Sequence, residues 1–443
     1  MPNHLTQGEW GEVLAKMKPW VGLESPPDQL RAEEQLLYPR GPLLSETDWD
    51  DLAAYFKGGA RQEGHAEPKP VPITDQFTAE IIQTPFGADC MSVFVHPKTH
   101  EIWVGQAAER KVYRQMVNGK WLEGMDWGGV PSRFMADENG VLAVIMSGYL
   151  PDASGQGMLV GWRDGTRKVM ARRLHRPTDL RRGDFDGSGQ PGLVWAEFGN
   201  RIGQVMQWNE GRNKRLLNWP GVVSLGMADI DCDNRMELIA LTGQAREGLI
   251  ILKQNQSGRW TGTVQLPRHP AWGHAHLQIV DFNEDGHPDV LITNGDNGDL
   301  TKIRTRPYHG VRVCLNDGKG QFQETVFLPL PGATQAHADD FDGDGDLDIV
   351  AIAHYAEWQR DPVEAAVFFQ QESRGTFTRW TLPGSNRGRW LTMAVADLDG
   401  DGDKDVVLGA MNGGPGSGTI TPALRRRWGE DPVALIRLRN GKP

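Results

Sequence analysis

The 443-residue sequence contains only three cysteines, Cys90, Cys232 and Cys314, which are too few and too scattered for a disulfide framework or a zinc cluster. Its longest apolar runs, such as residues 141–146, are far shorter than the ~20 residues that a membrane helix needs. The first residues lack the charged and apolar regions of a signal peptide. The net charge of −11, without a basic stripe, argues against a nucleic-acid partner. We therefore expect a globular protein with no membrane segment.

The acidic residues are concentrated in five copies of one nine-residue pattern. The copies span residues 184–192, 229–237, 281–289, 340–348 and 397–405, and their starts lie 45, 52, 59 and 57 residues apart. A strand-like apolar run follows each copy at once, and six to eight residues of alternating polarity precede it. The repeating unit is therefore strand, acidic loop and strand, followed by enough residues for two more strands.

Four strands in 45–60 residues is the period of a propeller blade. Upstream of the acidic copies, residues 101–104 and 141–146 occupy comparable places in two further units whose acidic loops are absent or eroded. The repeat therefore predicts a mainly β protein, namely a seven-bladed β-propeller over residues 75–443. A short α-helical segment at 1–60 and a linker at 61–74 are predicted to precede it.

The spacing inside each acidic loop suits a metal ion. Oxygen ligands at positions 1, 3, 5 and 9, with the carbonyl of position 7, can wrap a cation of calcium size, and glycine at position 6 permits the sharp turn. An EF-hand is excluded, because its closing carboxylate stands at position 12 and a helix follows it. We predict about four calcium sites with these ligands: Asp229, Asp231, Asp233 and Glu237; Asp281, Asn283, Asp285 and Asp289; Asp340, Asp342, Asp344 and Asp348; Asp397, Asp399, Asp401 and Asp405.

The five loops differ in completeness. Those at Asp340 and Asp397 carry every ligand, and those at Asp229 and Asp281 carry tolerable replacements. The loop at Asp184 has serine at position 5 and glycine at position 9, so it is predicted to bind weakly or not at all. The alternative is that these are ordinary Asp/Gly turns, which the repulsion between unpaired carboxylates at such close range disfavours.

The acidic loops resemble the FG-GAP/VCBS-type repeat, which also builds integrin α-chain propellers. Two further motifs, Asn-Gly-Asp-Asn-Gly-Asp at 294–299 and Arg-Pro-Tyr-His-Gly at 306–310, resemble bacterial VCBS-repeat proteins that carry a haem domain ahead of the propeller. The resemblance covers roughly residues 75–440. It implies calcium-stabilised blades in an extracytoplasmic protein, either periplasmic or secreted. It does not imply one activity, because propellers serve binding and catalysis alike.

Residues 1–60 are predicted to form helices, because capping-box patterns at 6–9 and 45–48 precede apolar residues at helical spacing. Their arrangement resembles the C-terminal part of a small c-type cytochrome domain. No Cys-x-x-Cys-His site is present, so no haem can be attached covalently to this chain as written. Met17 is either a former axial ligand or a core residue. Electron transfer stays open only if a haem site lies upstream in the gene.

The strand before each acidic loop alternates between an apolar and a polar set of residues. The first strand of a blade is innermost, so the polar set is predicted to face the central channel. The acidic loop joins the first strand to the second, so the other ends of these strands meet at the opposite end of the propeller. We therefore predict calcium at one end and a ligand pocket at the other, with these channel-face residues: His274, His276, Asp296, Asn297, His337, His354, Tyr355 and Trp390.

Two functions follow from this arrangement. The favoured one is a calcium-binding propeller that acts as an extracytoplasmic binding module for a glycan or a protein ligand. The alternative is an enzyme that acts on polysaccharide, foremost a lyase, in which a channel-face His or Tyr removes the proton next to a uronate carboxylate. The sequence contains no nucleophile elbow, P-loop or His-Glu-x-x-His motif that would favour an enzyme.

Overall fold

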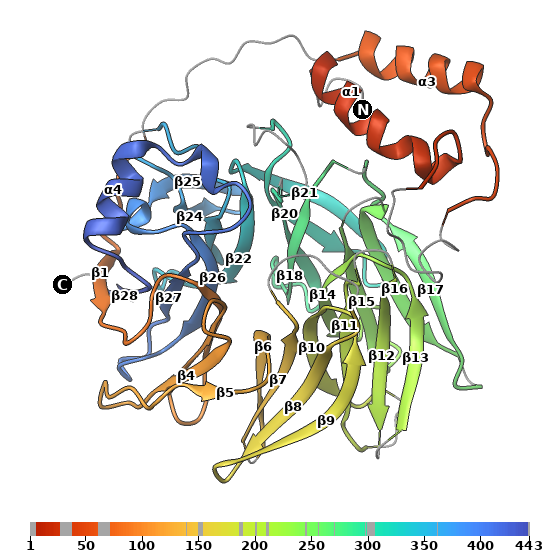
Figure 1. Cartoon of the computed structure of the whole chain (residues 1–443). Helices are drawn as coiled ribbons and strands as arrows, with labels where there is room; N and C mark the ends of the chain where they lie inside the picture. The colour runs from red at the N-terminus through yellow and green to blue at the C-terminus, as the bar shows by residue number, and fades with distance from the viewer. Residues whose placement is uncertain are drawn as a thin grey trace.

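Seven four-stranded antiparallel sheets surround a central axis in the computed structural model, which confirms the predicted seven-bladed β-propeller (Figure 1). The structure describes residues 6–26, 38–60, 71–138, 140–148, 154–185, 189–199, 202–209, 212–243, 246–255, 257–269, 271–296, 298, 306–360 and 362–441. None of the helices in these ranges is long and apolar enough to cross a membrane.

Six blades follow the chain in order, each with its first strand innermost. Blades 1 to 3 consist of β2 (Cys90–Val95), β3 (Ile102–Gln106), β4 (Lys111–Gln115) and β5 (Met125–Asp126); β6 (Val130–Asp137), β7 (Gly140–Met146), β8 (Gly157–Arg163) and β9 (Thr166–Leu174); β10 (Pro177–Gly183), β11 (Gly192–Glu197), β12 (Gln204–Asn209) and β13 (Arg212–Asn218). Blades 4 to 6 consist of β14 (Val222–Ala228), β15 (Glu237–Thr242), β16 (Gly248–Gln254) and β17 (Trp260–Gln265); β18 (His274–Val280), β19 (Asp289–Asn294), β20 (Gly310–Asn316) and β21 (Phe322–Pro329); β22 (Ala333–Asp339), β23 (Asp348–Ala353), β24 (Ala366–Ser373) and β25 (Thr376–Thr381).

Blade 7 closes the ring with strands from both ends of the chain. It contains β26 (Trp390–Ala396), β27 (Asp405–Ala410), β28 (Leu435–Asn440) and, outermost, β1 (Phe77–Ile82). The strand β1 pairs antiparallel with β28, with Phe77 opposite Asn440. Helix α4 (Pro422–Glu430) connects β27 to β28. The sequence predicted seven blades but not this exchange, which covers the edge that β28 would otherwise expose.

The blades pack through apolar faces. The second strands β11, β15, β19, β23 and β27 are buried along their whole length, as expected for strands covered on both faces. On β18, Leu277 and Ile279 pack towards blade 4, where a Cβ on Gly226 would lie 2.6 Å from Ile279. The apolar set of this innermost strand therefore lies between the blades, as its alternation predicted.

Each innermost strand carries a β-bulge near its start, where one residue is skipped in the pairing with the second strand. The seven bulged residues are partly exposed, and the residue before each of them is buried. An inserted residue reverses the side to which the preceding side chains point. The bulged residues are Met91, Ser132, Thr178, Val223, Ala275, Thr334 and Leu391.

The N-terminal segment is helical, as predicted. It contains α1 (Gln7–Met17), a 3-10 turn (Lys18–Val21) and α3 (Glu46–Gly58), and Ser45 and Asp48 form the predicted capping box of α3. Both helices lie over the side of the propeller that carries blades 4 and 5 (Figure 1). Met17 packs, partly buried, against an apolar cluster that joins the helices to blade 5: Trp10, Val13, Leu14, Trp49, Trp272 and Tyr308.

Acidic loops and a central cavity

The five acidic loops connect the first and second strands of blades 3 to 7, so they all lie at one end of the propeller. In every loop the first carboxylate accepts a hydrogen bond from the backbone N–H of position 6, at 2.8–3.2 Å. Position 6 has a positive φ throughout, from +64° at Asn234 to +100° at Gly402. This left-handed turn explains the glycine in the pattern, and asparagine is among the few residues that tolerate it.

The carboxylate of position 9 is buried and fixed by the backbone. Asp348 accepts hydrogen bonds from the N–H groups of Phe341, at 3.2 Å, and Gln371, at 2.8 Å. The equivalent Asp289 and Asp405 accept the same pair of bonds in their own blades. Burial raises the pKa of Asp348 and of Glu237 to about 7. The carboxylate that was predicted to complete each metal site is thus held in place by the blade itself.

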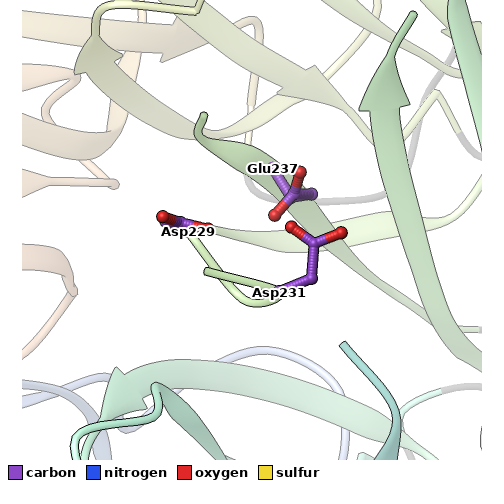
Figure 2. A group of neighbouring side chains, drawn as sticks. All are labelled: Asp229, Asp231 and Glu237. Atoms are coloured by element: carbon purple, nitrogen blue, oxygen red, sulfur yellow. The ribbon is translucent and has the colours of Figure 1, made fainter. Parts of the chain in front are cut away.

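Carboxylate oxygens converge in three of the loops. One oxygen from each member of a trio lies within 4.8 Å of the others, and the trios are Asp229, Asp231 and Glu237; Asp340, Asp342 and Asp344; Asp397, Asp399 and Asp401. Figure 2 shows the first trio, with Asp231 and Glu237 directed towards each other. An all-oxygen donor set with several carboxylates fits a hard cation such as calcium.

The remaining loop residues take part in the same turns. Asp233, Asp285, Asp344 and Asp401, at position 5, each accept a hydrogen bond from the backbone N–H two residues later. In the loop at Asp281 the Asn283 amide donates to Asp285 at 2.9 Å. In the loop at Asp184, residues 186–188 lie outside the described residues.

A cavity of about 420 Å³ occupies the central channel at the other end of the propeller. Its wall includes all seven bulged residues and the residues that end or follow several second strands. Five of the predicted channel-face residues line it: His274, His276, Asp296, His354 and Tyr355. Asn297 lies outside the described residues.

Two predicted channel-face residues lie elsewhere. Trp390 is fully buried and its indole N–H donates to the carbonyl of Ser385 at 2.9 Å. The prediction is wrong because it assumed a strict period of two, and the bulge at Leu391 puts Leu391 in the cavity wall instead. His337 lies outside the wall that the described residues form, further along β22 towards the acidic loop and 3.7 Å from Asp339.

A buried carboxylate organises one side of the cavity. Asp179 accepts hydrogen bonds from the Leu225 N–H, at 2.8 Å, and the Ser224 hydroxyl, at 3.1 Å, which joins blade 3 to blade 4. Arg181, at 2.6 Å, and Arg133, at 3.3 Å, pair with it. Burial acts to raise the pKa of Asp179, but the two arginines bring it below its ordinary value. Arg133 was not among the predicted site residues, because it lies on β6 of blade 2, whose loop lacks the acidic pattern.

The histidines of the cavity have different surroundings. Burial, together with the nearby Arg133, lowers the pKa of His276 to about 3, so its imidazole is neutral at pH 7. His274 is buried, and its Nδ1 lies 3.0 Å from a carboxylate oxygen of Glu247. Burial raises the pKa of Glu247 even though His274 opposes that shift. Both Glu247 and His274 line the cavity.

Apolar side chains also line the cavity. Met91 comes from blade 1, Met146 from blade 2, and Leu391 and Met411 from blade 7. The wall therefore combines apolar side chains with arginine, carboxylate and imidazole groups. Such a wall suits a ligand with an apolar face and several polar groups.

Comparison with known proteins agrees with this architecture. The FG-GAP-like repeat family matches residues 229–292, 294–351 and 340–408, which lie in blades 4 to 7. A selenomethionine-substituted virginiamycin B lyase from Staphylococcus aureus has a similar fold, with 11% identity, a TM-score of 0.50, and coverage of 82% of this chain and 98% of that chain. A streptogramin B lyase structure gives the same identity and coverage with a TM-score of 0.51. No curated protein matches the sequence.

The chain is therefore a seven-bladed β-propeller that contains FG-GAP-like repeats over residues 229–408. The likeness to the two lyases shows the fold alone, because the identity is only 11%. This type of propeller supports a binding or interaction role in general.

Proposed function

We propose that this protein is a calcium-stabilised binding module that acts outside the cytoplasm. Calcium would occupy the loops at Asp229, Asp281, Asp340 and Asp397, and a glycan or a protein segment would bind in the cavity at the opposite end. The observation that carries the calcium part is the convergence of carboxylate oxygens in three loops. Extracellular calcium modules bind in the range of 10⁻⁴–10⁻³ M. Loops of this kind would therefore be filled outside the cell.

The metal would have a structural role. Each loop joins the innermost strand of its blade to the buried second strand. A bound calcium ion would neutralise carboxylates that otherwise repel one another, and it would tie positions 1 and 9 together. Asp344 and Asp348 would hold the ion in blade 6 together with Asp340 and Asp342.

A calcium titration by isothermal titration calorimetry tests this part. The full chain is expected to bind about four calcium ions, and Asp344→Asn is expected to bind one fewer. Asp346→Asn is a matched control in the same loop, because position 7 would contribute its carbonyl and not its side chain. Absence of calcium binding to the wild-type chain at millimolar concentration would refute the calcium sites.

The ligand part is tested on calcium-loaded protein with glycan and peptide arrays. Ala275→Trp places a large side chain in the cavity wall and is expected to abolish binding. Val117→Trp adds the same side chain at an exposed turn and is expected to leave binding unchanged. Binding that survives Ala275→Trp would place the ligand site away from the cavity.

The second candidate is a polysaccharide lyase, and the contact between His274 and Glu247 favours it. A carboxylate that orients an imidazole is the arrangement of many general bases. Arg133 and Arg176 also line the cavity and could neutralise a uronate carboxylate. A panel of uronate polysaccharides, followed at the absorbance of the unsaturated product, tests this candidate. Product that is lost in His274→Asn would establish it, and no product from the wild type would exclude it for those substrates.

A further inference from the structure

Side chains from the third strands of the blades reach the acidic loops. In blade 4, Leu238 pairs with Leu252, and in blade 6 the equivalent Ile349 pairs with Phe369. The next residues, Lys253 and Gln370, therefore occupy equivalent positions. The Lys253 ammonium pairs with Asp231, at position 3 of its loop. The Gln370 amide donates to Asp342, at position 3 of the other loop, at 2.7 Å. The two blades thus place a cation and a neutral amide at the same point.

Blade 7 also places cations at position 3 of its loop. Arg437 Nη2 lies 2.6 Å from Asp399 and 2.5 Å from Asp405, so one guanidinium contacts both position 3 and position 9. Arg439 Nε lies 3.0 Å from Asp399, and Arg439 is the blade 7 equivalent of Lys253 and Gln370. The loops at Asp340 and Asp397 have aspartate at the same four predicted ligand positions. Among the described residues, arginines contact these aspartates only in the loop at Asp397.

We propose that Lys253, Arg437 and Arg439 are tethered cations that compete with calcium for the loop carboxylates, which makes the Asp340 loop the site of highest affinity. This inference rests on the calcium binding proposed above. A calcium ion at position 3 would lie a few ångströms from the ammonium or guanidinium group, where like charges repel strongly. The tethered cation must therefore move away before the ion binds, or it weakens the binding by repulsion.

The competition should adjust affinity without abolishing binding. The Lys253 side chain is 40% exposed, so its ammonium can turn into solvent. A partly exposed ion pair contributes little net stability, so its loss opposes calcium only modestly. We expect about a tenfold effect of one tethered charge on the dissociation constant of its own site.

A reciprocal exchange between blades 4 and 6 tests the inference in the full chain. Lys253→Gln gives blade 4 the residue of blade 6, and it is expected to lower one calcium dissociation constant about tenfold. Gln370→Lys gives blade 6 the residue of blade 4, and it is expected to raise the lowest dissociation constant about tenfold. Calorimetric calcium titrations report both effects, and circular dichroism confirms that each variant is folded.

Two controls separate a local effect from a change in net charge. Lys168→Gln removes one charge at an exposed position of blade 2, which has no acidic loop, and is expected to change no affinity. In an Asp344→Asn background, where the blade 6 site is disabled, Gln370→Lys is expected to have no further effect.

The possible failures are distinguishable. If the wild-type chain binds no calcium, the calcium part of the proposed function and this inference are both refuted. If calcium binds and Lys253→Gln and Gln370→Lys match the wild type, only the competition is refuted. The competition is also refuted if Lys168→Gln shifts affinity as much as Lys253→Gln.

Discussion

His276, a residue of the central channel, stays neutral in the folded protein at pH values where a free histidine is protonated. His276 lies beside Arg133 and Asp179 in the cavity wall, and burial lowers its pKa to about 3. In the unfolded chain a histidine has a pKa of about 6.5. Between these two values the unfolded chain takes up a proton that the folded protein does not. His276 therefore lowers the stability of the fold as the pH falls below 6.5.

This difference predicts the effect of His276→Gln. The wild type should lose up to about 1.4 kcal/mol of unfolding free energy per pH unit through this one group between pH 6 and pH 4. The variant should lose stability less steeply over the same range, because glutamine does not titrate. Urea unfolding at pH 7, 6, 5 and 4 measures both curves. Parallel curves would contradict an imidazole that stays neutral in the folded protein.

The elements of the N-terminal segment are held to blade 5 by aromatic contacts. Trp10 on α1 is buried, with its ring 5.6 Å from His269 and 4.4 Å from Phe56. Trp272 and Tyr308 of blade 5 stack at 4.7 Å beneath the helices. In the part of the segment that the structure describes, this aromatic cluster is the apolar contact that docks the helices on the propeller.

Removing that docking point should release the helices and spare the blades. Trp10→Ala is expected to cost about 3–5 kcal/mol of docking stability, since it deletes a buried tryptophan. Limited trypsin digestion should then cleave residues 7–58 faster, while the melting temperature of the propeller stays nearly unchanged. Tyr55→Ala, at an exposed position of α3, is the matched control and should resemble the wild type. A matching fall in the propeller melting temperature would show that the segment belongs to its core.

The repeat period and the apolar alternation predicted the blades, and the acidic pattern predicted which turn each loop would form. The bulges could not be predicted. The strands were predicted from strict alternation of apolar and polar residues, and this alternation does not indicate an inserted residue such as Leu391. The same reading put Trp390 in the channel. The cation at Asp231 is the ammonium group of Lys253. The register of the strands brings Lys253 to the loop, and the sequence of the loop itself does not indicate this contact.

At the scale of the whole molecule, hydrogen bonds at the end that carries the acidic loops connect neighbouring blades. The Asn316 amide of blade 5 donates to the carbonyl of Ile230 in the blade 4 loop, at 2.9 Å. The equivalent Asn440 of blade 7 donates to the carbonyl of Phe341 in the blade 6 loop, at 2.7 Å. Pairing of β1 with β28 then closes the ring. A change in one loop can therefore reach the next blade, so the loops should affect the stability of the whole propeller.

The melting temperature of the full chain with and without calcium tests the central claim most directly. In several millimolar calcium, each occupied loop adds stability by mass action. The account predicts that EDTA lowers the melting temperature by on the order of 10 °C. Restored calcium should reverse the change, and magnesium should not replace it, because magnesium demands a tighter octahedral site. A melting curve that is the same in calcium and in EDTA would contradict the account.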